Sequence, residues 1–439
     1  MKEHNRIIIV GTIPYNKNTS SRAFDAYFHN WEKDNLRQIF SNTKTPVKGH
    51  CGTLYQITDA RLLKRWIHRL DEVGVIFYEQ DLPDDWKDND LEVGNATFSK
   101  LYKIGSKDSP LKYILRGILW KKKYWNTKQL NDWLDEFQPE CVFLAFSDDY
   151  FIPRIALYIS SKYNIPIMSC IGDDYYFNHR KSLSPFYHIY RKTYKRLIDK
   201  VFQRPGSAIY IGNKIRDKYN SEFGLNGITV YLTSDIKRHE FRPINKTNPS
   251  FIYCGNVRLG RNYSLADIGM SLQQINKNYF IDVYSAERNE EFLKVLKKCP
   301  GVRFHGQISY KEVMRLTELS DVSVIVEGFS EQDVKATMYS LSTKAADAIA
   351  SGSSIFVYGS IDCGVVEYMN ETGCAVVCTD KMELEHSLKH LIFNGDFQRK
   401  LYERTIEVDI LDHDKDKNRL LTERMLEKLI QETRIMNER

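Results

Sequence analysis

The chain of 439 residues lacks the long apolar runs and paired cysteines that mark membrane-spanning, secreted or zinc-stabilised proteins. No segment approaches the ~20 apolar residues of a membrane-spanning helix, and the early run Ile7–Val10 is too short for a signal-peptide core. Its eight cysteines include no Cys-x-x-Cys pair, and most lie in or beside apolar runs. Reduced thiols are therefore expected, in a cytoplasmic protein without a metal site.

Two phosphate-binding motifs are also missing. Neither half contains Gly-x-Gly-x-x-Gly, which disfavours a nicotinamide-dependent dehydrogenase. Gly255 and Gly260 enclose four residues but are not followed by Gly-Lys-Ser/Thr, so this segment is not a nucleotide-triphosphate loop. Any phosphate recognition must come from another arrangement.

The composition is that of an ordinary globular protein, with 42% hydrophobic and 27% charged residues. A chain of this length exceeds what one hydrophobic core usually serves, which predicts two domains. The net charge of +6 suits an anionic substrate or membrane surface. It is weak evidence for nucleic acid, and we expect no nucleic-acid partner.

Short apolar runs alternate with helical patterns along the chain, which is typical of parallel βαβ units. Six strands are predicted in each half: 7–10, 73–77, 141–146, 165–170, 208–211 and 228–232, then 251–254, 280–284, 302–305, 322–326, 355–357 and 375–377. The class is α/β, with two Rossmann-like domains facing each other across a cleft. Ligands of such sheets bind beyond the carboxyl ends of the strands.

A polar, proline-bearing stretch at 233–250 is the best linker candidate. We therefore expect an N-terminal domain at 1–240 and a C-terminal donor-side domain at 241–415. The charged amphipathic helix at 416–439 is expected to pack back toward the N-terminal domain.

The most informative segment is the run from Tyr339 to Gly352, Tyr-Ser-Leu-Ser-Thr-Lys-Ala-Ala-Asp-Ala-Ile-Ala-Ser-Gly. The amide groups at a helix N-terminus favour a bound anion. Ser342 and Thr343 add hydroxyls, Lys344 adds a positive charge, and Asp347 can accept hydrogen bonds from a ribose. The alternative is a capped helix whose lysine and aspartate are simply solvated.

A second segment, Tyr-Cys-Gly-Asn-Val-Arg-Leu-Gly-Arg-Asn at 253–262, follows the first predicted strand of the second domain. Gly255 permits a tight turn, and Arg258 and Arg261 can approach an anion from the side opposite Lys344. The alternative is a polar turn with solvated arginines.

With these two segments, residues 251–394 resemble the donor-binding domain of GT-B glycosyltransferases. The resemblance is to the bacterial family 4 enzymes of capsule and exopolysaccharide synthesis, and it extends to Val-Arg-Phe-His-Gly-Gln-Ile-Ser at 302–309 and Ser-Asp-Val-Ser-Val-Ile-Val-Glu at 320–327. The N-terminal half is similar mainly in layout, with a turn at Gly11. The implied donor-site residues are Arg261 and Lys344 for the diphosphate, Arg258 as their helper, Gln307 and Ile308 for the base, and Asp347 for the ribose.

The resemblance also implies an acidic residue near the donor sugar, with seven residues between it and the ribose acid. Tyr339 occupies that position here, so the acid is Glu327 or Glu331, and Glu327, which ends a strand, is preferred. The family's histidine in the first domain has no equivalent, and Asp148 and Asp149 occupy that region. They are candidates for a general base or for orienting an acceptor; helix capping is the equally weighted alternative.

Two stretches, 111–128 and 180–200, combine basic and aromatic residues. They are either solvated helix faces or a surface for peripheral attachment to the inner face of the plasma membrane.

The predicted activity is transfer of a hexose from a nucleoside diphosphate sugar to a cell-surface polysaccharide or lipid-linked glycan. No cofactor or metal is expected, and the resemblance implies retention of the anomeric configuration. The alternatives are a non-catalytic subunit that stabilises a partner transferase and a sugar-nucleotide epimerase.

Overall fold

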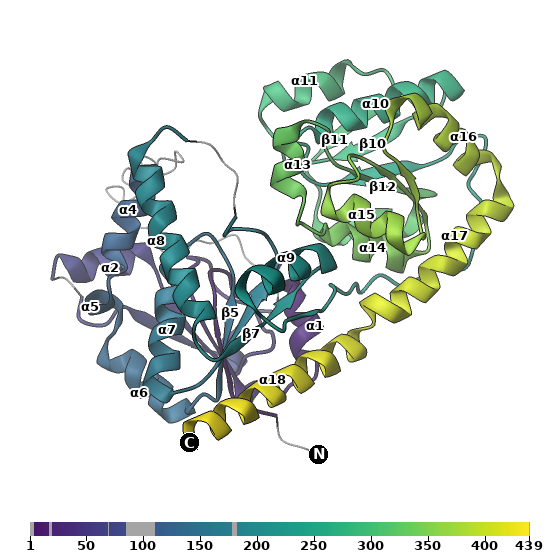
Figure 1. Ribbon diagram of the computed structural model, residues 1–439. Helices are drawn as coiled ribbons and strands as arrows, with labels where there is room; N and C mark the ends of the chain where they lie inside the picture. The colour runs from purple at the N-terminus through teal and green to yellow at the C-terminus, as the bar shows by residue number, and fades with distance from the viewer. Residues whose placement is uncertain (1–3, 17–19, 69, 85–109, 178–181, 439) are drawn as a thin grey trace. The chain divides into compact units, whose positions relative to one another are not determined.

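The computed structural model describes residues 4–16, 20–68, 70–84, 110–177 and 182–438. The chain forms two compact units, shown in Figure 1: residues 1–230 with 416–439 form the first unit, and residues 231–415 form the second. The expected boundary at residues 240 and 241 falls inside the second unit.

The first unit is built on an eight-stranded sheet in the order β4-β3-β2-β1-β5-β6-β7-β8. All neighbouring strands are parallel except β3 and β4, which are antiparallel. The strands are β1 (Ile7–Val10), β2 (Leu36–Phe40), β3 (Thr53–Ile57), β4 (Gly74–Tyr78), β5 (Cys141–Ala145), β6 (Ile167–Ile171), β7 (Gly206–Tyr210) and β8 (Ile228–Thr229).

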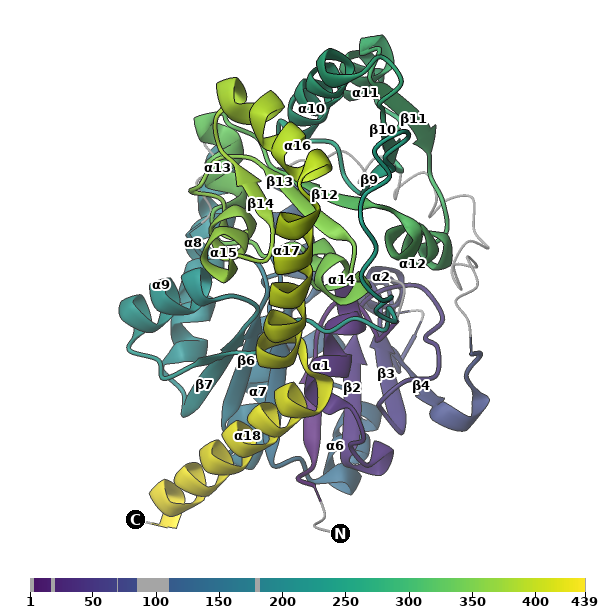
Figure 2. The ribbon, with the colours of Figure 1, turned by 90° about the vertical axis from the view of Figure 1, so that its right-hand side faces the viewer.

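Helices cover both faces of this sheet because successive strand residues point to opposite sides. Its described helices are α1 (Phe24–Phe28), α2 (Asp59–Trp66), α4 (Pro110–Leu119), α5 (Lys122–Trp125), α6 (Lys128–Phe137), α7 (Ile152–Tyr163), α8 (Pro185–Phe202), α9 (Asn213–Phe223) and α18 (Lys415–Glu438). Ile8 and Val10 belong to the core shared with α6 and α7, whereas Ile7 and Ile9 belong to the core shared with α1 and α18. In Figure 2, α18 lies along this unit.

The second unit contains a six-stranded parallel sheet in the order β11-β10-β9-β12-β13-β14. Its strands are β9 (Phe251–Cys254), β10 (Ile281–Tyr284), β11 (Val302–Gly306), β12 (Val322–Val326), β13 (Ser354–Tyr358) and β14 (Val376–Cys378). Its helices are α10 (Arg261–Ile275), α11 (Glu290–Lys298), α12 (Tyr310–Leu319), α13 (Glu331–Thr337), α14 (Thr343–Ser351), α15 (Gly364–Thr372), α16 (Leu384–Phe393) and α17 (Gly395–Val408).

All twelve predicted strands are present, but two strands of the first sheet, β2 and β3, were not predicted. Each contains a glutamine that interrupts the apolar pattern. The side chains of Gln38 and Gln56 are buried and donate hydrogen bonds to the carbonyls of Ile13, at 3.1 Å, and Asn42, at 2.7 Å. A buried amide with a backbone partner is compatible with a central strand, although its residue type indicates exposure.

The stretch 233–250 has no helix or strand, and it is fastened to the second unit. The guanidinium of Arg238 donates to the carbonyl of Ile349 at 2.7 Å and to the carboxylate of Asp409 at 3.0 Å. Among the described helices, none has the length and hydropathy needed to span a membrane.

Candidate functional site

Three segments meet at the carboxyl end of the second sheet: the loop after β9, the residue after β12 and the first turn of α14. A methyl group added at Gly255 would lie 2.4 Å from Cε and 2.8 Å from Nζ of Lys344, so the loop backbone runs directly against the lysine. Farther along this loop, the carbonyl of Leu259 faces Gly328, just after β12. The fold therefore brings together the glycine turn and the lysine helix that the sequence singled out.

Arg261 and Glu327 form a two-pronged ion pair at this edge. Nε and a terminal nitrogen of Arg261 donate to the two carboxylate oxygens of Glu327 at 3.0 and 2.9 Å. The side chains are 13% and 4% exposed. Burial lowers the pKa of the Arg261 guanidinium, but Glu327, together with Tyr253, outweighs this effect and holds the pKa above its usual value.

Lys344 is the second cation of the site and is much less firmly held. Its Nζ donates one long hydrogen bond, 3.4 Å, to Oγ of Ser342, and lies 5.4 Å from the centre of the Tyr253 ring. Among the described residues, no carboxylate lies within 4 Å of this ammonium group. Burial, reinforced by the charge of Arg261, lowers the pKa of Lys344 to about 8.

The nine-residue helix α14 lies where the sequence predicts a helix, and Ser342 is its N-cap. Oγ of Ser342 accepts from the backbone N–H of Lys344 at 3.4 Å, and Thr343 is the first helical residue. Asp347, on the second turn, is buried and accepts a 2.7 Å hydrogen bond from Oγ of Ser234. Lys344 and Asp347 both line a small cavity of about 30 Å³ beside β9 and β12.

Arg258 lies on the same loop as Gly255 but is engaged elsewhere. Its guanidinium forms an ion pair with Glu287, and its side chain is 54% exposed. Arg258 and the backbone N–H groups of Asn289 and Arg288 lower the pKa of Glu287 to about 2. The predicted helper cation is thus held by a partner on the β10–α11 loop.

The other predicted donor-side residues lie on separate loops. Gln307 is exposed and Ile308 half-buried, between β11 and α12. Glu331, the alternative acid, is the first residue of α13, is 82% exposed and pairs with Lys335. Of the two acids considered, Glu327 is therefore the one the structure joins to Arg261.

In the first unit, Gly11 follows β1 and donates its backbone N–H to the carbonyl of Ile39 at 3.0 Å. A methyl group added there would lie 3.0 Å from Cβ of Ala145, so this glycine permits close approach of the chain segments after β1 and β5.

Asp149 is buried and accepts a 2.6 Å hydrogen bond from Arg116, which also pairs with Asp59 at 2.8 Å. Burial raises the pKa of Asp149 to about 6; Arg116 opposes this, and Asp148 and Asp59 add to it. Neither aspartate caps the next helix, because the N-cap of α7 is Phe151 and it has no side-chain cap bond. Asp148 is half-buried, which leaves it the more accessible of the two carboxylates.

Three contributors to the site were not predicted from sequence: Glu287, Ser234 and Tyr253. Glu287 and Ser234 hold Arg258 and Asp347 from distant points of the chain, and nothing local marks them as partners. The hydroxyl of Tyr253 donates a 2.5 Å hydrogen bond to the carbonyl of Asn256, and Nζ of Lys344 lies over the Tyr253 ring. Within the described part of the chain, no group of three or more His, Cys, Asp or Glu residues is placed to hold a metal.

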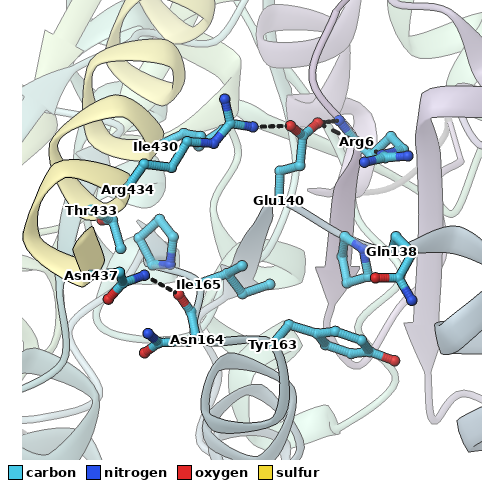
Figure 3. Close-up of a pocket in the computed structure, with 12 residues that line it drawn as sticks. Arg6, Gln138, Glu140, Tyr163, Asn164, Ile165, Ile430, Thr433, Arg434 and Asn437 are labelled. Atoms are coloured by element: carbon cyan, nitrogen blue, oxygen red, sulfur yellow. Dashed lines mark hydrogen bonds and ion pairs between the residues drawn. The ribbon is translucent and has the colours of Figure 1, made fainter.

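A larger cavity, about 260 Å³, lies in the first unit at the amino ends of β1, β5 and β6, next to α18 (Figure 3). Glu140 bridges the backbone N–H of Arg6, at 2.9 Å, and the guanidinium of Arg434 on α18. Nearby, the side-chain amide of Asn437 donates to the carbonyl of Asn164 at 2.9 Å. These contacts fasten α18 to the first unit, and no predicted site residue lines the cavity.

No protein-family model and no curated protein matches the chain. Solved structures do resemble it. HepE from Anabaena in complex with UDP has a TM-score of 0.58 at 10% identity, covering 96% of this chain and 100% of that one. Sucrose-phosphate synthase from Thermosynechococcus elongatus has a TM-score of 0.55 at 11% identity, covering 97% of this chain and 99% of that one.

The E. coli trehalose-6-phosphate protein bound with UDP-2-fluoro glucose has a TM-score of 0.58 at 9% identity, covering 97% of this chain and 98% of that one. The similarity therefore extends over nearly the full length of both chains in each case, at a sequence identity that carries information on the fold alone. The predicted fold class is confirmed: the chain has the α/β, two-Rossmann-domain GT-B fold.

Proposed function

We propose that this protein is a glycosyltransferase that transfers a hexose from a nucleoside diphosphate sugar to a glycan acceptor. UDP is the nucleotide we propose, because HepE and the E. coli neighbour carry UDP and a UDP-sugar analogue in their structures. The acceptor we propose is a cell-surface polysaccharide or a lipid-linked glycan. We also propose retention of configuration, which the resemblance to family 4 implies.

The observation that carries this proposal is the state of Lys344. The ammonium group of Lys344 is partly buried next to Arg261, donates one 3.4 Å hydrogen bond and has a pKa lowered to about 8. Its positive charge is therefore poorly compensated by the protein. It lies on the first turn of α14, where backbone N–H groups and the helix dipole also favour an anion. A diphosphate supplies both the charge and the acceptor oxygens that this site lacks.

Arg261 would then join the diphosphate from the other side. In the structure its guanidinium is neutralised by Glu327, so binding the diphosphate requires the arginine to share or exchange this partner. Two cations and a helix N-terminus would stabilise the charge that develops on the departing diphosphate, and the reaction we propose needs no metal. Asp347, already hydrogen-bonded by Ser234, would bind the ribose, and Gln307 and Ile308 would contact the base.

In the first unit we assign the acceptor-side carboxylate to Asp148. Asp149 is buried and held by Arg116, which suits a residue that positions the loop after β5. Asp148 is more accessible and would orient an acceptor hydroxyl or accept its proton.

Incubation with UDP-, GDP- and ADP-sugars, with nucleotide release as the readout, tests this function. We expect release from a UDP-sugar, stimulated by a glycan acceptor and abolished in Lys344→Met. Interconversion of free nucleotide sugars without release would instead indicate an epimerase. Neither binding nor release with any donor, together with a partner transferase that copurifies and is unaffected by Lys344→Met, would indicate a non-catalytic subunit.

A further inference from the structure

Helices α4 and α8 expose an apolar and basic surface that the donor site does not use. The two helices lie side by side in the first unit, as Figure 1 shows. Tyr113 on the first turn of α4 stacks on Tyr190 on the second turn of α8, with 4.6 Å between the ring centres. We call the outward residues of this pair the α4–α8 face. They are Leu115, Ile118, Phe186, Ile189, Lys192 and Arg196.

Packing within the fold does not require these side chains. The inner stripe of α8 includes Tyr190, Tyr194 and Ile198, which are buried in an aromatic cluster. On α4, Arg116 points inward to Asp59 and Asp149. The face is therefore what remains after each helix has buried its own apolar stripe.

Four apolar side chains on this face are open to solvent. Leu115 and Ile118 are 57% and 43% exposed on α4, and Phe186 and Ile189 are 44% and 54% exposed on α8. On each helix the pair is three residues apart, so its members lie on one side. Single exposed apolar residues are ordinary, but two such pairs on adjacent helices form a patch that marks an interaction site.

Two exposed basic side chains lie beside this patch on α8. Lys192 and Arg196 are exposed on the next two turns of α8, four residues apart. The one acidic residue of α8, Asp199, accepts a hydrogen bond from the Tyr176 hydroxyl at 2.8 Å. Among the described residues, no carboxylate lies within 4 Å of either base.

The structure also corrects the aromatic part of the sequence interpretation. Trp120 and Trp125 are each 1% exposed, and Tyr187, Tyr190 and Tyr194 are buried, so these rings belong to the core. Phe186 is the exposed Phe, Tyr or Trp side chain among the described residues of 111–128 and 180–200. The guanidinium of Arg191 donates hydrogen bonds to the carbonyls of Tyr175 and Tyr176. Arg180 and Lys181 lie outside the described residues.

We propose that the α4–α8 face docks on an anionic lipid bilayer, with its four apolar side chains in the interfacial region and Lys192 and Arg196 against acidic headgroups. A bilayer surface accommodates both features together, because apolar side chains enter its interfacial region and basic side chains contact acidic headgroups. This inference extends beyond the proposed sugar transfer, and its test uses no nucleotide sugar.

Co-sedimentation of the full chain with vesicles tests the proposal. We expect binding to vesicles of phosphatidylglycerol and phosphatidylcholine, and little binding to phosphatidylcholine alone. The double variant K192Q/R196Q should weaken partitioning on the order of 30-fold, since each base near an acidic surface contributes about 1 kcal/mol. The variant F186S/I189S should weaken it at least about 10-fold even at low salt.

Matched controls are K294Q/K298Q, which removes two exposed lysines of α11, and I435S/M436S, which removes two exposed apolar residues of α18. Both should bind vesicles like the wild type, and circular dichroism should show all four variants folded. Absence of wild-type binding to anionic vesicles, or equal losses in the controls, overturns the proposal. So does self-association that F186S/I189S abolishes while vesicle binding stays unchanged.

Discussion

Glu327 holds Arg261 through two hydrogen bonds of 2.9 and 3.0 Å, whereas Lys344, the other cation of the site, has no carboxylate within 4 Å among the described residues. One positive charge is therefore compensated by a carboxylate within the protein, and the other has no such partner among the described residues. This asymmetry makes the two cations experimentally distinguishable.

Glu327→Gln should release Arg261 from its ion pair and strengthen nucleotide binding. With its neutralising partner removed, the guanidinium becomes available to a diphosphate, and we expect UDP to bind about 10-fold more tightly. Turnover should fall if the carboxylate acts on the donor sugar. Isothermal titration with UDP measures the first effect and nucleotide release the second. Glu287→Gln is the matched control, since it frees Arg258 in the same way; equal tightening in both variants would contradict a special role for Glu327.

Lys344→Met should remove nucleotide binding without unfolding the protein. Methionine keeps the length of the side chain and removes a charge that is poorly compensated in the free protein. We expect UDP affinity to fall at least about 100-fold, as for loss of one preorganised donor to a developing anion, while the melting temperature is maintained or rises. A parallel loss of affinity and of melting temperature would indicate a structural role.

The same variant should change how stability depends on pH. The pKa of Lys344 is lowered from 10.5 to about 8 in the folded chain, so between these values the unfolded chain binds more protons. Stability therefore rises with pH across this window, and Lys344→Met should lack this rise. Lowering the pKa from 10.5 to about 8 corresponds to at most about 3.4 kcal/mol over the whole window, and to less because the side chain is partly open to solvent. Urea unfolding of both proteins at pH 7.5 and 9.5 measures it.

Gly255→Ala should displace Lys344. The added methyl group would lie 2.4 Å from Cε of the lysine, which has to move away from the first turn of α14. We expect weaker UDP binding with the fold retained. Gly395→Ala is a suitable control because a methyl group there meets no atom within 4 Å. Titration with UDP compares the nucleotide affinity of the two variants. Unchanged affinity in Gly255→Ala would show that Lys344 does not contact the nucleotide.

Asp148→Asn should slow sugar transfer while leaving UDP affinity unchanged, because Asp148 lies in the unit that does not hold the donor residues.

Asp149→Asn should act chiefly on stability. The pKa of Asp149 is raised from 3.8 to about 6, so its contribution to stability is present below pH 3.8 and lost as pH rises through about 6. Transfer rates and acid unfolding of the two variants separate these roles; equal rates in Asp148→Asn and the wild type would remove Asp148 from the mechanism.

The sequence predicted the parallel strands of the second sheet and the start of α14 because those signals are local. The apolar run Val322–Val326 indicates a buried strand from its own residue types, and Ser342 caps α14 through a bond to the residue two positions away. By contrast, β2 and β3 were missed because each carries a glutamine whose partner lies on another segment.

The pairing of the candidate site could not be predicted for the same reason. Arg261 and Glu327 are 66 residues apart, and Ser234 and Asp347 are 113 apart. Sequence pattern identified most of these residues, but only the sheet order, which places β9 beside β12, shows which of them meet. The two aspartates after β5 are a second example, because Asp149 is buried and paired with Arg116 of α4, a partner 33 residues away in the sequence.

The most direct test of the account is a crystal structure of the protein with UDP. We predict that the diphosphate lies at the first turn of α14, with its oxygens about 3 Å from Nζ of Lys344 and within reach of the Arg261 guanidinium. A diphosphate bound away from α14, with Lys344 still hydrogen-bonded only to Ser342, would contradict the account.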